Sequence, residues 1–142
     1  MLDLYAGTGA VGIEALSRGA TDALFVEIHR SAARLIRANL EGLAVPIHRA
    51  RVLHRPVERA IAELARTNQT FDLIWADPPF ESWEEGLAAL VSAFDSGLTT
   101  YDTTLCLECP ADADVATALP TGLVIERDLR GGASRVVMIR AR

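Results

Sequence analysis

The stretch Asp3-Leu4-Tyr5-Ala6-Gly7-Thr8-Gly9-Ala10-Val11-Gly12 joins an apolar segment to a helical one through a glycine-rich turn, and it decides the fold. The apolar run 1–6 is typical of a buried strand, and residues 10–18 have the apolar spacing of a helix. Glycine at positions 7 and 9 lets the backbone turn tightly and approach a ligand closely. The helix start behind the turn offers N–H groups that lack helical partners. We therefore expect the ligand-binding strand–turn–helix unit of an α/β domain.

The remainder of the chain continues this alternation of strand and helix patterns. Strands are expected over 22–28, 47–53, 71–76 and 103–109, and helices over 31–40, 57–66 and 83–94, with Ser31 as a helix cap. Residues 122–128 and 134–140 flank a Gly-Gly turn and predict a terminal antiparallel hairpin. The order predicts an α/β, Rossmann-like fold, in which a doubly wound, mostly parallel seven-stranded sheet forms one domain over residues 1–142.

Composition narrows the class of protein. Half of the 142 residues are hydrophobic and 23% are charged, which suits an ordered domain. No apolar run reaches the roughly 18 residues that a membrane span needs, and no signal peptide is visible, so we expect a cytoplasmic protein without a membrane partner. The net charge of -5 argues mildly against tight nucleic-acid binding by this chain alone.

Two acidic residues near the glycine turn indicate which ligand it favours. The pattern Gly7-x-Gly9-x-x-Gly12 alone is weak evidence for a dinucleotide site. Asp3 lies in the first strand, where a carboxylate would repel a pyrophosphate but would suit the ammonium of a methionine moiety. Glu27 ends the second strand, 27 − 9 = 18 residues after Gly9, where it can accept hydrogen bonds from ribose hydroxyls. NAD and S-adenosylmethionine both carry such a ribose, so only Asp3 separates them, in favour of S-adenosylmethionine.

The tetrapeptide Asp77-Pro78-Pro79-Phe80 follows the fourth expected strand, which should lie beside the first. Two successive prolines fix φ and remove two backbone donors, so the segment is stiff and rich in acceptors. The Asp77 carboxylate and the Pro78 carbonyl can hold the two hydrogens of an exocyclic amino group, and Phe80 can stack on an extruded base. This arrangement indicates methyl transfer to a base nitrogen, in which catalysis rests on positioning and electrostatics.

Together these residues resemble class I methyltransferases and, more closely, the bacterial 16S ribosomal RNA guanine-N2 methyltransferase family of the RsmD type. The resemblance extends over nearly all of the chain and rests on the stretches Leu2–Ala20, Phe25–Glu27, Asn39–Leu40 and Phe71–Phe80. The first stretch is specific to this family and its close relatives. The last stretch is shared by many amino-group methyltransferases.

The resemblance implies an enzyme that transfers methyl from S-adenosylmethionine to guanine N2 of 16S rRNA. Its partner would be rRNA or a pre-assembled small ribosomal subunit, with no metal. It also implies a role for eight residues, namely cofactor contacts at Asp3, Ala6, Gly7, Gly9 and Glu27 and catalytic contacts at Asp77, Pro78 and Phe80.

The sequence departs from the family pattern in two places. The family carries an acidic or amide residue after the third strand that contacts the adenine, whereas residues 52–58 have no acid at that place, so the backbone of His54 or Arg55 would substitute. The family also has a basic N-terminal segment before the first strand. We expect that native residues precede Met1 and that the chain is weakly active or inactive without them.

Other readings stay open at this point. The tetrapeptide also suits N6-adenine or N4-cytosine methylation of DNA and methylation of a glutamine side chain. A non-catalytic nucleotide-binding module and a NAD-dependent oxidoreductase are alternatives from other classes.

For several further residues the sequence favours a structural role over a functional one. Cys106 and Cys109 are spaced as C-x-x-C within a strand, which places them on opposite faces and favours a structural role over a metal or redox site. Arg30, Arg34 and Arg37 share one helix face that could touch phosphates, although a solvated face is the favoured interpretation. Trp75 is expected in the core.

Overall fold

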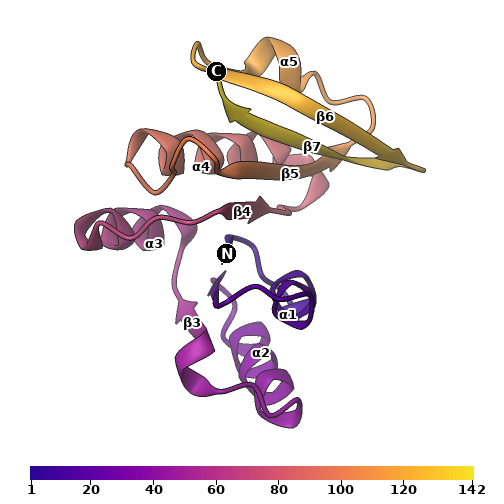
Figure 1. The fold of residues 1–142 in the computed structure, drawn as a ribbon. Coiled ribbons are helices and arrows are strands. Elements are labelled where there is room, and N and C mark those ends of the chain that lie inside the picture. Colours follow the sequence, from indigo (N-terminus) through magenta and orange to yellow (C-terminus); the bar gives the residue numbers. More distant parts are fainter.

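A seven-stranded sheet with the order β3-β2-β1-β4-β5-β7-β6 forms the centre of the computed structural model, which describes residues 1–142 (Figure 1). Its strands are β1 (Leu2–Asp3), β2 (Ala23–Glu27), β3 (Ala50–His54), β4 (Leu73–Ala76), β5 (Thr104–Pro110), β6 (Leu123–Gly131) and β7 (Ser134–Ala141). The first five run parallel, and β7 pairs antiparallel with both β5 and β6. The predicted doubly wound sheet with its terminal hairpin is therefore confirmed.

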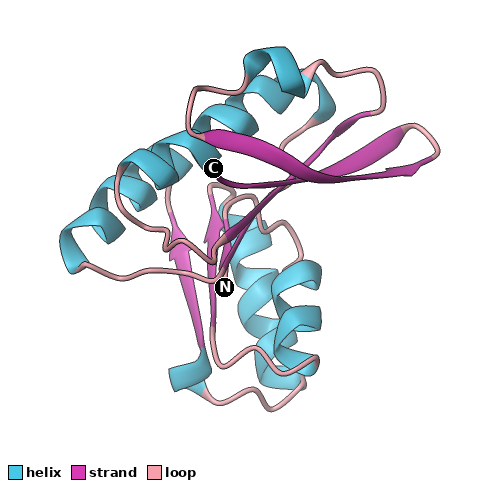
Figure 2. Ribbon diagram, turned by 45° about the horizontal axis from the view of Figure 1, so that its top comes forward, coloured by secondary structure: helices cyan, strands magenta, loops and turns pink.

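Helices cover both faces of the sheet (Figure 2). They are α1 (Ala10–Ser17), α2 (Arg30–Gly42), α3 (Val57–Leu64), α4 (Trp83–Asp95) and the short α5 (Val115–Ala118). Single 3-10 turns occupy Ile47–Arg49, Ala65–Thr67 and Phe80–Ser82. None of the helices is long and apolar enough to cross a membrane.

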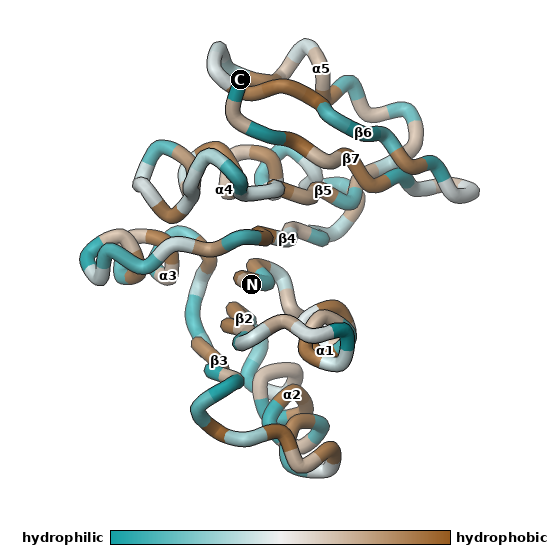
Figure 3. Tube along the Cα trace, viewed as in Figure 1, coloured by the Kyte–Doolittle hydropathy of each residue, from teal (hydrophilic) through white to brown (hydrophobic).

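Two unequal hydrophobic cores lie on the two faces. The larger has 25 buried residues and joins alternate strand positions such as Leu2, Val26 and Ile74 to α3 and α4. The smaller has seven and packs α1 and α2 on Phe25 and its neighbours. In Figure 3 the hydrophobic residues of the tube alternate with hydrophilic ones along α2 and α3, as expected for helices with one buried face.

The first strand is shorter than the predicted run 1–6, but its hydrogen bonding continues beyond Asp3. The Leu4 amide donates to the Trp75 carbonyl (2.9 Å), and the Ala6 amide donates to the Val26 carbonyl (3.0 Å). The backbone therefore stays hydrogen-bonded to the neighbouring strands, β4 and β2, as far as Ala6, where the glycine turn begins.

Three details of the sequence prediction were wrong. Helix α2 begins at Arg30, because the Ala33 amide already bonds the His29 carbonyl, so Ser31 lies inside the first turn and caps nothing. Strand β3 begins at Ala50 and not at Ile47, since the Arg49 amide closes a turn onto the Pro46 carbonyl. Helix α5 was not predicted, although Asp114 caps it through the amide and hydroxyl of Thr117.

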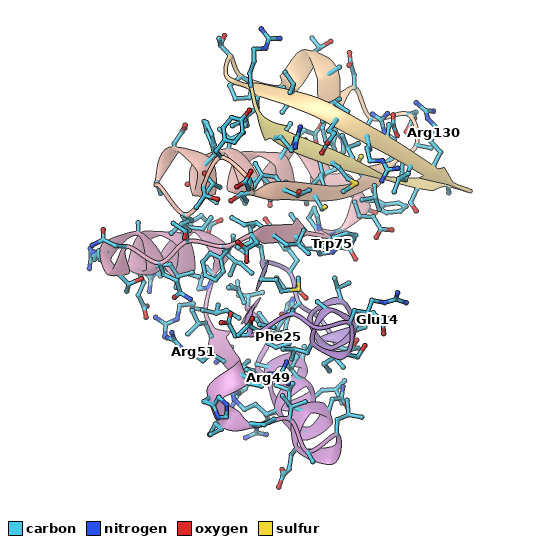
Figure 4. The ribbon with its side chains drawn as sticks, in the orientation of Figure 1. Glu14, Phe25, Arg49, Arg51, Trp75 and Arg130 are labelled. Carbon is cyan, nitrogen blue, oxygen red and sulfur yellow. The ribbon has the colours of Figure 1, made fainter.

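Trp75 was predicted in the core; it packs against the smaller core but is only partly buried, and its indole N–H has no partner. Register pairs Trp75 with Asp3 on one side and with Cys106 on the other, so all three side chains point to the same sheet face. Helices α1 and α2 pack over β1, β2 and β3, and Trp75 lies at the margin of their cover (Figure 4).

Candidate active site at the carboxyl ends of β1, β2 and β4

The predicted ligand-binding residues lie at the carboxyl ends of three adjacent parallel strands. Asp3 ends β1, Glu27 ends β2, and Asp77 directly follows β4. Because β1 pairs with both β2 and β4, these three carboxylates are brought to one edge of the sheet, beside the glycine turn. Open α/β sheets bind ligands at this edge.

The glycine turn is built as the sequence suggested. Gly7 and Gly9 have φ of 54° and 82°, which favour glycine, and Gly9 caps α1. A side chain at Gly7 would meet no heavy atom within 4 Å, so open space lies before that backbone. Gly12 has a different reason to be glycine, because a Cβ there would lie 2.3 Å from the Phe25 ring.

Glu27 is buried and held by two backbone donors. Its Oε2 accepts from the Gly7 amide at 2.8 Å, and its Oε1 accepts from the His29 amide at 2.7 Å. One N–H of the glycine turn is therefore already used within the protein. The two bonds fix the carboxylate while each oxygen keeps a further lone pair for a ligand hydroxyl.

Asp3 is almost fully buried, with 1% of its surface exposed, and its Oδ2 has no hydrogen-bond partner. Burial, with smaller contributions from the charges of Asp77 and Glu27, raises the pKa of Asp3 from 3.8 to about 7, against the lowering by the amides of Gly12 and Tyr5. The mutual influence of these carboxylates places them in one electrostatic region. An unpartnered buried carboxylate oxygen is a suitable counter-group for a cationic ligand.

Asp77 remains accessible, whereas the ring of Pro78 is buried. Helix α4 approaches this proline closely, since a Cβ on Gly86 would lie 2.5 Å from Pro78 Cγ. Partial burial and the charge of Glu108 raise the pKa of Asp77 to about 6, so its carboxylate is mostly ionised at neutral pH. Phe80 opens a 3-10 turn and leaves 41% of its surface exposed, as an apolar face beside the acceptors.

One contact at the site was not anticipated. Asn39 of α2 donates through Nδ2 to the Thr8 carbonyl at 3.0 Å and so braces the glycine turn from the side. Residue Ala6, predicted to touch the ligand, is buried and fixed by its bond to β2. His54 and Arg55, the predicted substitutes for the missing acid, lie beside Glu27. His54 pairs with Glu27 in register, and the Arg55 amide donates to the Glu27 carbonyl at 3.1 Å.

The C-x-x-C pair lies apart from this site. Both cysteines are free and buried, and burial raises the pKa of Cys106 to about 11 and that of Cys109 above its ordinary value. Such thiols stay protonated at neutral pH and are poor nucleophiles. No group of three or more histidine, cysteine or acidic side chains is gathered as a metal site.

Comparison with known proteins matches this fold and sequence to methyltransferases. The chain is 39% identical over 94 residues to the "Putative rRNA methyltransferase YlbH" of Bacillus subtilis, covering 66% of this chain and 50% of that protein. It is 37% identical over 79 residues to "Ribosomal RNA small subunit methyltransferase D" of Escherichia coli, covering 56% of this chain and 37% of that protein. The chain thus spans half or less of the length of these curated relatives.

Solved structures agree over nearly the whole chain. A conserved hypothetical protein from Streptococcus pyogenes superposes with a TM-score of 0.86 at 29% identity, covering 99% of this chain and 84% of that one. The putative methyltransferase yhhF from Escherichia coli gives a TM-score of 0.79 at 25% identity, covering 99% of this chain and 74% of that one. These likenesses confirm the class I methyltransferase fold and the family resemblance. Residues 1–140 match the family model described as "Conserved hypothetical protein 95", and the chain belongs to that family.

Proposed function

We propose that this chain is the catalytic core of a methyltransferase that uses S-adenosylmethionine and modifies an exocyclic amino group of an rRNA base. Guanine N2 of 16S rRNA, presented in the small ribosomal subunit, is the proposed target. The observation that carries the proposal is the position of Asp77 and Pro78 at the end of β4, next to the glycine turn and the unpartnered carboxylate of Asp3.

The residues present fit S-adenosylmethionine. The buried Oδ2 of Asp3 lacks a partner and would take the ammonium of the methionine moiety. Glu27, held by two amides, would accept the ribose hydroxyls. Ala6, Gly7 and Gly9 would lie along the cofactor, with open space in front of Gly7. When bound, this cofactor supplies a methyl group on a sulfonium, with a neutral leaving group.

The chain's own residues would position the base. The Asp77 carboxylate and the Pro78 carbonyl would each accept one hydrogen of the amino group, which turns the nitrogen lone pair out of conjugation with the ring. Packing of the Pro78 ring against Gly86 keeps this loop in place. Phe80 would stack on the base. A carboxylate with a pKa of about 6 can also accept the proton that the nitrogen loses after methylation.

The test is substitution of Asp77 in the full-length protein. We expect Asp77→Ala to lower methyl transfer into small ribosomal subunits by on the order of a hundredfold or more, as for loss of one preorganised polar group at a reacting centre. Binding of S-adenosylhomocysteine, measured by calorimetry, should change little. Asp72→Ala is the matched control, because Asp72 is exposed at the opposite end of the same strand.

Undiminished transfer by the Asp77→Ala protein would remove Asp77 from catalysis. Calorimetry with NAD in place of S-adenosylhomocysteine tests the oxidoreductase alternative. That alternative requires the protein to bind NAD and not S-adenosylhomocysteine. Transfer to DNA or to a glutamine-containing peptide, with none to rRNA, would replace the proposed substrate and leave the site intact.

A further inference from the structure

Positive charge in this acidic molecule lies in two segments, and the one at the β3 end is mostly unpaired. Residues 127–142 hold five arginines, of which Arg130, Arg135 and Arg140 form ion pairs. All 14 basic residues are arginines, and residues 28–57 hold six of them with the single acid Glu41. Residues 67–126, by contrast, hold eleven acids and no arginine or lysine. In Figure 1 the basic segment 28–57 forms α2 and β3 at one end of the sheet. The acidic segment lies mostly in the middle, around β4, α4 and β5, with β7 and β6 beyond it.

The arginines of α2 share one flank of the helix that faces the edge strand. Arg30, Arg34 and Arg37 are spaced four and three residues apart, so they line one side of α2. Arg37 donates to the Val52 carbonyl of β3 at 3.2 Å, which shows that this side looks toward β3. The core side of the helix lies about a quarter turn away and consists of Ala33, Ile36 and Leu40.

Five arginines at this end have no carboxylate within 4.0 Å. They are Arg30, Arg34, Arg37, Arg49 and Arg51. The sixth, Arg55, forms an ion pair with Glu63. Arg49 is fixed by two backbone carbonyls of the α1–β2 turn, while Arg51 extends from the edge strand (Figure 4). Close like charges without counter-charges repel one another, so this arrangement favours a negatively charged partner.

A groove runs between the end of α2 and the outer strand β3. Its volume is about 560 Å³, and it is lined by Arg37, Arg51 and Glu41 and otherwise by apolar side chains, among them Leu40, Val45 and Val52. Ile47, at its rim, is 91% exposed. Strand β3 is an edge strand of the sheet, so no strand pairs with its outer side.

We propose that Arg30, Arg34, Arg37, Arg49 and Arg51, here called the arginine surface, bind the phosphodiester backbone of the RNA that carries the target base. The inference rests on the proposed function. The planar guanidinium matches phosphate oxygens with paired hydrogen bonds. Arg30 follows Glu27 by only three residues, so the surface begins beside the candidate site and continues along the sheet edge. Nucleotides flanking a base held at Asp77 would cross it.

The test compares two double variants of the full-length protein with equal loss of charge. Arg34 and Arg51 are both exposed, and their side chains form no hydrogen bond or ion pair within the protein, so R34Q/R51Q removes two charges without removing an internal contact of this kind. R66Q/R142Q is the control, because Arg66 and Arg142 are also exposed and have no ion pair but lie outside the arginine surface. Binding of a fluorescein-labelled RNA hairpin with single-stranded flanks is measured against salt concentration.

For R34Q/R51Q we expect the slope of the logarithm of affinity against that of salt to fall by about 1.5 to 2, with binding about tenfold weaker at low salt. The control pair should retain the slope, and both variants should bind S-adenosylhomocysteine like the parent. Equal weakening by the two variants would overturn the proposal. The proposal would also be overturned if R34Q/R51Q left RNA binding unchanged and sedimentation showed that it dissociates a dimer. The arginine surface would then join two copies of this chain.

The two proposals fail separately. Weaker RNA binding by R34Q/R51Q, combined with intact transfer by Asp77→Ala, would keep the arginine surface and reject the catalytic assignment. Loss of transfer by Asp77→Ala, with unchanged RNA binding by R34Q/R51Q, would do the reverse.

Discussion

Asp3 combines features that stability alone would not select. Its carboxyl group is buried, one oxygen has no partner, and two other carboxylates share its surroundings. Burying a carboxylate in this way opposes ionisation. Ionised Asp3 is therefore unfavourable in the folded protein, and a cationic ligand would offset this cost, so one carboxyl group lowers stability and favours ligand binding.

The pH dependence of stability tests this view of Asp3. Its pKa is about 7 in the folded protein and near 3.8 when unfolded, so between those values only the folded form holds the proton. Stability contributed by the protonated group is lost as pH rises from about 4 to about 7, by at most about 1.4 kcal/mol per pH unit. Asp3→Asn removes this loss. In urea unfolding, the free energy of unfolding of the Asp3→Asn variant, relative to that of the parent protein, should increase as the pH rises from about 4 to about 7. A constant difference would contradict the assignment.

Gly12 provides a second test at the residue scale. Alanine in a helix is ordinarily better than glycine by about 1 kcal/mol. At this position, however, the new methyl group would lie 2.3 Å from the fully buried Phe25 ring. Gly12→Ala should therefore destabilise the protein by about 1–3 kcal/mol in urea unfolding. Gly42→Ala is the control, since no heavy atom lies within 4 Å of that position, and it should be neutral or stabilising.

At the scale of elements, the connection between β4 and β5 depends on one buried hydroxyl. Thr103 donates through Oγ1 to the Phe71 carbonyl at 2.7 Å and accepts from the Thr100 amide at 2.7 Å. It is 2% exposed, so water cannot replace either partner. This hydroxyl fixes the turn ahead of β5 to the segment that enters β4.

Thr103→Val keeps the shape of the side chain and leaves the Thr100 amide and the Phe71 carbonyl short of a partner. We expect a loss of about 1–3 kcal/mol in the free energy of unfolding. Thr121→Val, at an exposed position, should change it by less than about 0.5 kcal/mol. A similar result for the two variants would show that the turn does not depend on this hydroxyl.

Strand and helix order was predictable because apolar periodicity and glycine turns are local properties of the sequence. The residues at which strands and helices begin and end were less predictable. Ser31 has the chemistry of a cap, yet the preceding carbonyl at His29 already starts the helix. Residues 47–49 are compatible with a strand, but Pro46 accepts the closing bond of a 3-10 turn.

The candidate site was predictable in part for a topological reason. Asp3, Glu27 and Asp77 each end or follow a parallel strand, and adjacent parallel strands deliver such residues to one edge. The brace from Asn39 to Thr8 and the packing of Gly86 on Pro78 depend on how helices approach across the fold. Local sequence carries no signal for either contact.

At the scale of the whole molecule, the two faces of the sheet differ in how they are covered. The larger core joins the sheet to α3 and α4, and the smaller one joins it to α1 and α2. Trp75 and Cys106 lie on the second face, beyond the centre of that smaller core. Trp75 packs against that core but is only partly buried, which strand periodicity could not predict, because it assigns a face and does not show how far a helix extends over it.

Arginine-rich segments lie at the two edges of the sheet, around β3 and in β6 and β7, and the acid-rich residues around β4 and β5 lie between them. A polyanion would therefore be repelled from the middle of the sheet and attracted to its edges, so an approaching molecule would turn an edge toward it. Diffusing encounters would then be sorted by orientation before any contact forms. The range of this sorting is set by the ionic atmosphere, about 8 Å at physiological salt, so it acts in the last step of approach.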